Sequence, residues 1–168
     1  MNRRQLLWLT AAMAVAGHLP SCSAPDLTGP PTIRMGRDQC AECGMIINED
    51  RCSCALLVVR DGAREHLLFD DIGCLLTNRE TTDAIVVVEA YVRDHASGKW
   101  SNFDQASFLM ADRERLPTPM GSGIVAFADV GGAEGLRASV GGEVLDAGRI
   151  QPAHVAWLEA RFGKRADR

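Results

Sequence analysis

Apolar positions along the chain form one long run near the start and shorter segments after it. The run from Leu6 to Gly17 is interrupted only by Thr10. Its 12 residues are too few for a membrane-spanning helix, which needs about 20. Arg3 and Arg4 precede it, and a basic start before a short apolar run is typical of an export signal. We therefore expect residues 1–21 to be a signal peptide.

The apolar run is followed by Leu19-Pro20-Ser21-Cys22, which resembles the lipobox of bacterial lipoproteins. In that interpretation Cys22 becomes the lipidated N-terminus and anchors the protein to the membrane. The alternative is an exported protein that is cleaved nearby and carries no lipid. Residues 22–36 contain several prolines and a glycine, so we expect them to form a tether.

Short apolar segments separated by turn residues predict both strands and helices in the rest of the chain, which is compatible with an α+β fold. Asp61-Gly62 favours a hairpin between two of the strands. The first unit, residues 37–95, is expected to contain strands at 52–59, 65–69 and 84–91 and a helix at 71–78. The second, residues 96–168, is expected to contain strands at 106–111, 124–128 and 143–145 and helices at 132–140 and 154–162.

Composition and charge narrow the class of protein only slightly. The chain has 18 Lys plus Arg and 22 Asp plus Glu, a net charge of -4. Loss of the signal would remove two arginines and no acidic residue, which brings the net charge to -6. This balance gives no reason to expect a nucleic-acid partner.

Five cysteines remain in the domain after Cys22, so at least one thiol must stay unpaired within the chain. Cys52 and Cys54 lie two apart in an expected strand, where Cα atoms are about 6.7 Å apart. That separation is at the long limit for a disulfide. We expect these two cysteines, and Cys74 near the start of a helix, to be buried packing residues.

Cys40 and Cys43 form a C-x-x-C pair in a loop ahead of the first strand, where we expect both thiols to be accessible. The pair is compatible with a redox dithiol, half of a zinc site or a soft-metal site. A thioredoxin-like dithiol should open a helix after a strand, whereas Gly44 follows Cys43 directly. Met45 adds a thioether, and thiolate with thioether selects Cu(I). The three alternatives stay open on these residues alone.

Most of the chain beyond the tether resembles the NosL family. Five segments carry the resemblance, in the family's order and at near-family spacing: Cys40-x-x-Cys43-Gly44-Met45-x-Ile47, Phe69-Asp70-Asp71-Ile72-Gly73-Cys74, Tyr91-Val92-x-Asp94, Trp100, and Thr118-Pro119-Met120-Gly121-x-Gly123-Ile124-x-Ala126-Phe127.

This resemblance implies a periplasmic lipoprotein that carries Cu(I) to the copper-sulfide centre of nitrous oxide reductase. The partners it implies are that enzyme and a membrane complex of an ABC-type transporter with a periplasmic subunit. It also implies a fold of two small ββαβ units with a likeness to organomercurial lyase. A carrier of this kind is not an enzyme.

Our candidate copper ligands are the Cys43 thiolate and the thioethers of Met45 and Met120, one methionine from each unit. Cys40 is a further candidate ligand, or a residue that receives the ion first or protects Cys43 in a disulfide. The other candidate residues are expected to have structural roles and not to bind copper. Met110 is expected in the core, Met35 on the tether side, Asp70 and Asp71 at a helix N-terminus, and His66, His95 and His154 at surface or capping positions.

Two competing hypotheses come from other classes of protein. A thiol oxidoreductase or an organomercurial lyase-like enzyme would use Cys40 and Cys43 with turnover. A structural lipoprotein with a zinc clip would bind one zinc ion per chain and fold without copper.

Overall fold

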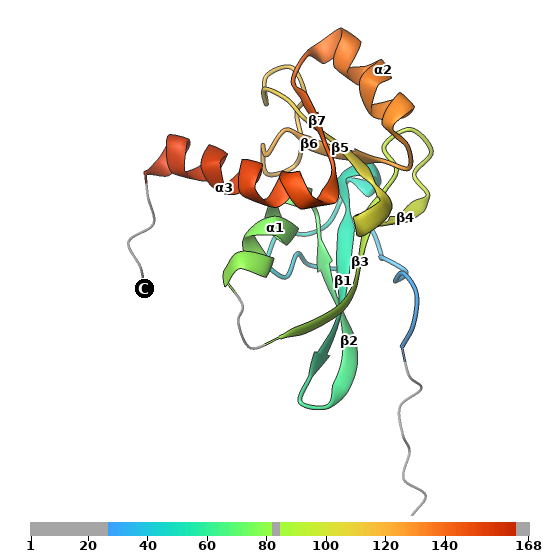
Figure 1. Cartoon of the computed structure of the whole chain (residues 1–168). Coiled ribbons are helices and arrows are strands. Elements are labelled where there is room, and N and C mark those ends of the chain that lie inside the picture. The colour runs from blue at the N-terminus through green and yellow to red at the C-terminus, as the bar shows by residue number, and fades with distance from the viewer. Residues whose placement is uncertain (1–26, 82–84, 164–168) are drawn as a thin grey trace, which may run out of the picture.

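The computed structural model describes residues 27–81 and 85–163. The expected signal peptide, Cys22 and the beginning of the expected tether lie outside the described residues. Within them the chain forms two small antiparallel sheets and three α-helices (Figure 1). No helix in the described ranges is long and apolar enough to cross a membrane.

The first sheet has the strand order β2-β1-β3-β4, and every neighbouring pair is antiparallel. Its elements are β1 (Cys54–Arg60), β2 (Ala63–Phe69), α1 (Ile72–Thr81), β3 (Val86–Arg93) and β4 (Trp100–Asn102). The hairpin between β1 and β2 turns at Asp61 and Gly62, whose φ angles are 51° and 78°. Two positive φ angles define a type I′ turn, so the predicted Asp-Gly hairpin is confirmed.

The second sheet has the order β6-β5-β7, again antiparallel. Its elements are β5 (Ser107–Met110), β6 (Ile124–Phe127), α2 (Val130–Val140) and β7 (Glu143–Leu145), and α3 (Ala147–Phe162) follows. In both sheets the first strand is central and a helix precedes the third strand. The predicted α+β fold of two ββαβ units is therefore confirmed. β4, within the range 96–168 expected for the second unit, pairs with the first sheet.

Two element boundaries differ from the sequence prediction because side chains cap the backbone elsewhere. Cys52 was expected in the first strand, but it ends a short 3-10 helix, Asp50–Cys52, which Glu49 caps by accepting from the Arg51 N–H. The strand begins only at Cys54. The last helix begins at Ala147 rather than at residue 154, because Asp146 accepts from the Arg149 N–H and starts it two turns earlier.

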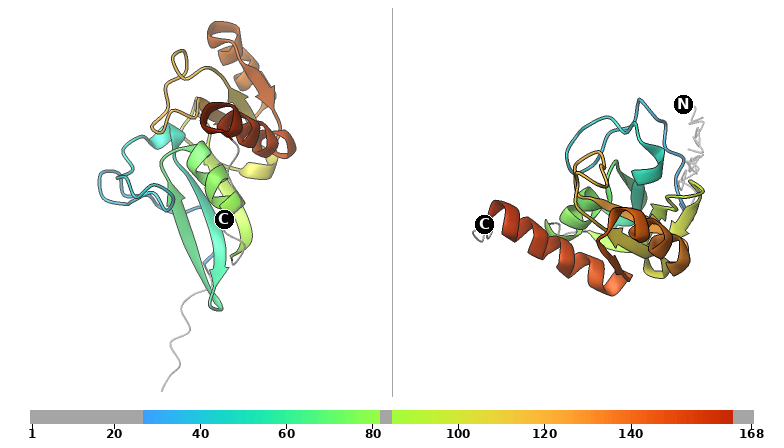
Figure 2. Two further views of the ribbon diagram at one scale, coloured as in Figure 1. Left: turned by 90° about the vertical axis from the view of Figure 1, so that its left-hand side faces the viewer. Right: turned by 90° about the horizontal axis from the view of Figure 1, so that it is seen from above.

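The two units share one hydrophobic core. A parallel bridge joins Asp94 to Ala126, and the His95 N–H donates to the Ala126 carbonyl over 2.8 Å. Phe103, Phe108 and Ile124 pack in the same cluster as β1 and α1. α1 lies on one face of the first sheet, and α3 packs against α1, β5 and β7 (Figure 2). The beginning of α1 is thereby held between the two sheets.

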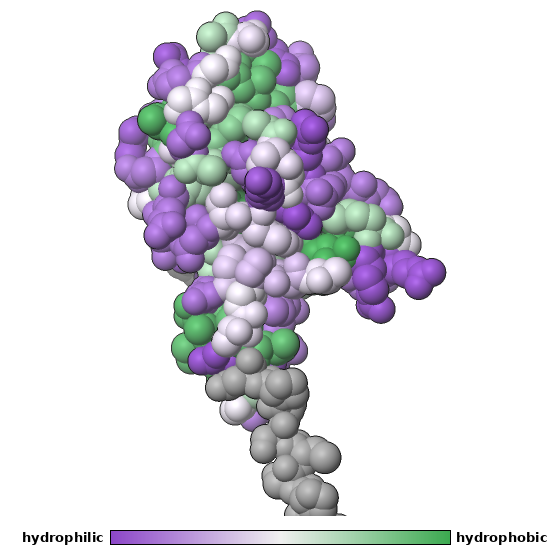
Figure 3. Space-filling view, turned by 90° about the vertical axis from the view of Figure 1, so that its right-hand side faces the viewer, coloured by the Kyte–Doolittle hydropathy of each residue, from purple (hydrophilic) through white to green (hydrophobic). Residues whose placement is uncertain are grey.

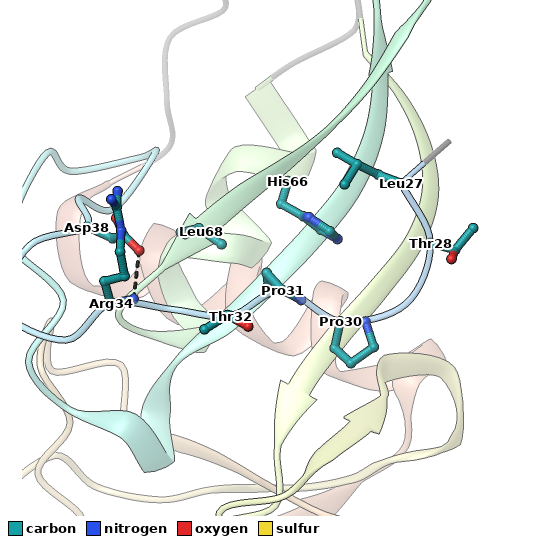
Figure 4. Close-up of a pocket in the computed structure, with 9 residues that line it drawn as sticks. All are labelled: Leu27, Thr28, Pro30, Pro31, Thr32, Arg34, Asp38, His66 and Leu68. Atoms are coloured by element: carbon teal, nitrogen blue, oxygen red, sulfur yellow. Dashed lines mark hydrogen bonds and ion pairs between the residues drawn. The ribbon is translucent and has the colours of Figure 1, made fainter. Parts of the chain in front are cut away.

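The described end of the expected tether packs against β2 (Figure 4). Arg64 donates to the Leu27 carbonyl over 3.2 Å, and the His66 ring lies 2.9 Å from the Gly29 carbonyl oxygen. Ile33 is buried in the main core. An open pocket lies between this segment and β2. From Leu27 onward, the range 22–36 is thus attached to the domain.

The hairpin end of the first sheet carries exposed apolar side chains. Leu27, Val86, Val87 and Val88 are all exposed. The sheet register places Val86 beside Val59, which in turn pairs with Arg64 near the hairpin turn. Figure 3 shows apolar surface at this end, beside the point where the N-terminal trace leaves the domain. The cysteine-rich loop, residues 40–45, lies near the opposite end of β2.

Candidate metal centre

The loop that carries Cys40 and Cys43 is closed by its own backbone. The Cys40 N–H donates to the Met45 carbonyl over 2.8 Å, and the Gly44 N–H donates to the Cys40 carbonyl over 2.9 Å. Gly44 has φ 74°, a conformation that glycine adopts without steric cost. The Ala41 N–H donates to the Leu68 carbonyl over 2.8 Å and fastens the loop to the end of β2. The pair therefore sits in a tight turn and does not open a helix.

The opposite side of the site is the junction between β2 and α1. Asp71 caps the helix, because its Oδ1 accepts from the Gly73 N–H over 2.7 Å. This capping role agrees with the sequence prediction for Asp71. Asp70 precedes it with a buried carboxylate, and Cys74 is the third residue of α1. The junction thus directs a carboxylate and a thiol toward the cysteine loop.

Four side chains from these two segments form a cluster that could hold a metal ion. One donor atom from each of Cys40, Cys43, Asp70 and Cys74 lies within 4.8 Å of all the others. Three sulfurs spaced evenly around one ion at about 2.3 Å each lie about 4.0 Å apart. A contraction of less than about 1 Å therefore suffices to bring the three sulfurs onto one ion. The donor set of three thiols fits a thiophilic metal.

The two thiols of the C-x-x-C pair differ in exposure. Cys40 is only 2% exposed, so the prediction that both thiols are accessible is wrong for this residue. The closed turn places its side chain under the loop, in the main core. Cys43 is half-buried, and its sulfur lies 3.8 Å from Asp70 Oδ1. An incoming partner can thus approach Cys43 more readily than Cys40.

The neighbouring thiols strongly shift one another's pKa values. A hydrogen bond from the Cys74 thiol lowers the pKa of Cys40 to about 6. Donating that hydrogen bond, together with burial, raises the pKa of Cys74. Burial, followed by the hydrogen bond with Cys40, raises the pKa of Cys43 to about 11. Cys40 is therefore the thiol of the cluster that loses its proton most readily.

Two exposed methionines lie on loops that are bonded to this cluster. Met45 is 52% exposed, and its carbonyl accepts from Cys40. Met120 is 42% exposed, and its N–H donates to Asp71 Oδ2 over 2.9 Å. The same carboxylate oxygen accepts from the Thr118 hydroxyl over 2.7 Å, which fixes the second unit's loop to the start of α1. Each unit thus contributes one exposed methionine, carried on a loop tied by backbone hydrogen bonds to the cluster or to its neighbour Asp71.

The remaining candidates lie in different surroundings. Met110 ends β5 and packs against the main core, as predicted, and Met35 is 37% exposed. Cys52 and Cys54 are buried and free, also as predicted, although they belong to separate core clusters. Among the described residues, no histidine belongs to the metal-like cluster.

His154 differs from its predicted surface or capping role. It is buried in the middle of α3, with its Nε2 3.2 Å from the Thr77 hydroxyl. Its ring stacks on Trp157. Because α3 begins at Ala147, position 154 turns toward α1 instead of opening the helix.

The sequence interpretation missed Cys74 and Asp70 as members of the cluster. Cys74 is buried, as expected, but its sulfur faces two other thiols and not only apolar neighbours. Both residues lie in the segment that joins β2 to α1. The available signal was their placement at the end of a strand beside which the C-x-x-C loop could fold back.

Comparisons with known proteins agree with this architecture. The NosL family model matches residues 32–155. The crystal structure of the copper chaperone NosL from Shewanella denitrificans superposes with a TM-score of 0.54, at 21% sequence identity, over 74% of this chain and 99% of that chain. At this identity the superposition shows a shared fold. Comparison with curated protein sequences gives no significant match.

Proposed function

The chain belongs to the NosL family, and from this premise we propose that it is a Cu(I) carrier that acts by ligand exchange. The observation that carries the proposal is the cluster of three thiols beside two exposed methionines. Cys43, Met45, Met120 and Cys40 are the proposed ligands. Thiolates bind Cu(I) and zinc and not magnesium, and the neutral thioethers favour the soft monovalent cation over zinc. The protein with the matching fold is itself described as a copper chaperone.

Ligand exchange requires an ion that an incoming donor can reach. Cys43 is half-buried, and the two methionines are exposed, so a thiolate or thioether of a partner can bind the ion before an old bond breaks. A neutral thioether leaves without taking up a proton. The copper stays monovalent throughout, so the transfer needs no oxidant or reductant.

We propose a carrier and not an enzyme. A dithiol oxidoreductase needs an exposed attacking thiol, whereas the cysteine with the lowered pKa, Cys40, is buried. Rates of disulfide exchange and of carbon–mercury cleavage at the uncatalysed background would agree with this proposal. Turnover that depends on Cys40 and Cys43 would contradict it.

The proposed client is nitrous oxide reductase, whose copper-sulfide centre would receive the ion. The proposed partner at the membrane is an ABC-type transporter with a periplasmic subunit. A lipid on Cys22 would hold the chain on the periplasmic side of a bacterial membrane and raise its local concentration there. Loss of the lipidated Cys22 should leave copper binding intact and reduce delivery in cells, which a Cys22→Ala strain tests through the copper content of the client.

Thermal unfolding of the reduced chain with and without Cu(I) tests copper binding directly. At free Cu(I) about 1,000 times the dissociation constant, binding should stabilise the fold by about 4 kcal/mol. A double variant, Cys43→Ser with Met45→Leu, should lose this stabilisation. Cys52→Ser is the matched control, because Cys52 is a buried thiol in another core cluster. An unchanged melt for the native chain would refute the proposal, as would a shift that survives in the double variant.

A further inference from the structure

Cys74 occupies a position that packing alone does not explain. It is the third residue of α1 and is buried, like Cys52 and Cys54. Its sulfur nevertheless lies within 4.8 Å of the sulfurs of both Cys40 and Cys43, whereas Cys52 and Cys54 belong to no such cluster within the described residues. Three thiols from two segments therefore converge at one point of the core boundary.

The sulfur atoms around this point are graded by exposure. Cys40 and Cys74 are buried, Cys43 is half-buried, and Met45 and Met120 are exposed. Cys43 is therefore intermediate in exposure between a buried pair of thiols and an exposed pair of thioethers. A single ion that keeps its bond to Cys43 can exchange its other ligands between the two pairs.

We propose that Cys74 is a copper ligand, and that Cys40, Cys43 and Cys74 hold Cu(I) in a closed state distinct from an open state formed by Cys43, Met45 and Met120. This inference rests on the proposed function. Three thiolates enclose the ion from the buried side, where a partner cannot reach it. The open state presents the ion at the surface, where exchange with a partner occurs.

The step between the two states is a ligand exchange that balances without electron transfer. The Cys40 and Cys74 sulfurs form bonds to the ion as the two thioether bonds break. Each thiol that is protonated releases its proton to solvent as it binds, and the methionines leave as neutral thioethers. Delivery to a partner begins with the reverse of this step. The ion returns to the open state, and a sulfur of the partner then binds it.

X-ray absorption on the full chain loaded with one equivalent of Cu(I) distinguishes the ligands when every methionine is replaced by selenomethionine. Copper–sulfur scattering then reports cysteines, and copper–selenium scattering reports Met45 and Met120. We expect three sulfur neighbours and little selenium in the native chain. In Cys74→Ser the sulfur count should fall and the selenium contribution should rise. Cys54→Ser should match the native spectrum, since Cys54 is fully buried but outside the cluster.

A native spectrum with one sulfur and two selenium neighbours would overturn the inference. This test uses the native chain alone, so it does not depend on whether a variant folds. Identical spectra for Cys74→Ser and Cys54→Ser would also overturn it. If the native chain binds no Cu(I), the proposed function itself fails. If the native chain binds one equivalent but its spectrum is the same in Cys74→Ser, only this inference fails.

The rate of copper removal gives a second readout. Mutation of a residue that only contacts a metal ligand typically costs 10–100-fold in metal affinity. Loss of a direct ligand should therefore speed the removal of copper by bicinchoninate about tenfold or more. Cys74→Ala provides a second substitution, with far-UV circular dichroism and thermal melting as checks of folding. An unchanged removal rate in a folded Cys74→Ala chain would contradict the closed state.

Discussion

The role that we propose for each residue of the site follows from its exposure. Large apolar side chains are usually buried, yet Met45 and Met120 expose about half of their surface on loops held by backbone hydrogen bonds. Their backbones are fixed while their thioethers stay accessible. This combination suits a donor that must meet a partner without unfolding its own loop.

Replacing either methionine should therefore slow copper exchange without destabilising the fold. We expect Met45→Leu and Met120→Leu to change the free energy of unfolding by less than about 0.5 kcal/mol, as is usual for exposed sites. The rate of Cu(I) uptake from a bicinchoninate complex should fall in both. Met35→Leu is the matched control, because Met35 is also exposed but lies on the N-terminal segment. Equal rates in all three variants would show that the thioethers take no part in exchange.

Gly73 allows the two units to meet at the site. A Cβ at this position would lie 2.6 Å from the Ser122 Cβ and 3.2 Å from the His154 Cε1. Gly73→Ala should therefore push the loop that carries Met120 away from α1, destabilise the fold by about 1–3 kcal/mol and slow copper uptake. Gly135→Ala in α2, where nothing lies near the added carbon, should be neutral or stabilising. Chemical denaturation and stopped-flow uptake measure the two effects.

At the scale of elements, α1 organises the site because both of its neighbours contact its first two turns. Asp71 caps the helix with one carboxylate oxygen and accepts from the loop at Thr118 and Met120 with the other. α3 approaches from the far side through His154, whose ring lies against Thr77. A movement of α1 would therefore displace Cys74 and the loop of Met120 together.

The buried ring of His154 should make the packing of α3 on α1 sensitive to acid. Burial lowers the pKa of His154 in the folded state. The unfolded chain then takes up a proton first as the pH falls below about 6.5. The contribution to stability is thus complete above that pH and is lost as the pH falls through the lowered pKa.

Urea unfolding between pH 7 and 5 measures this loss. His154→Gln should show a shallower decline than the native chain, because the titrating ring is gone. Thr77→Val should lower stability at every pH and keep the native decline, since it removes the neighbour and leaves the ring. A native slope in His154→Gln would assign the acid sensitivity to other groups.

The elements were largely predictable from local patterns, whereas the site was only partly so. The Asp61-Gly62 turn, the strand segments and the helix at α1 depend on residues that are close in sequence. The burial of Cys40 and its contact with Cys74 depend on a loop that folds back on β2. The pattern of apolar residues along the sequence does not reveal such a contact. The start of α3 was misplaced because the capping side chain of Asp146 starts the helix at Ala147, ahead of Pro152.

At the scale of the whole molecule, the proposed open state for copper requires both units in a fixed arrangement. The cysteines all belong to the first unit, and Met120 belongs to the second. The shared core and the contacts around Asp94 provide the fixed arrangement. Asp94 accepts from the Ser97 hydroxyl over 2.6 Å and from the Ala128 N–H over 2.8 Å, so one carboxylate joins the two sheets.

Weakening this junction should lower stability without separating the units. In Asp94→Asn an amide N–H₂ replaces one accepting oxygen, so a buried donor loses its partner at a cost of about 1–3 kcal/mol. Because apolar residues of both units pack in one cluster, unfolding should remain a single cooperative transition. Circular dichroism and tryptophan fluorescence should then give the same denaturation midpoint, and two separate midpoints would show that the units fold independently.

The same carboxylate predicts a loss of stability in strong acid. Burial alone would raise the pKa of Asp94, but hydrogen bonds from Ser97 and Ala128 outweigh it and lower the pKa. Its contribution is therefore present above the unfolded pKa of about 3.9 and is lost as the pH falls through the lower folded value. Asp94→Asn should remove this part of the acid dependence. Because Met120 and the cysteines lie on opposite sides of the junction, the variant should also slow Cu(I) exchange, while Arg137→Gln on the exposed face of α2 should not.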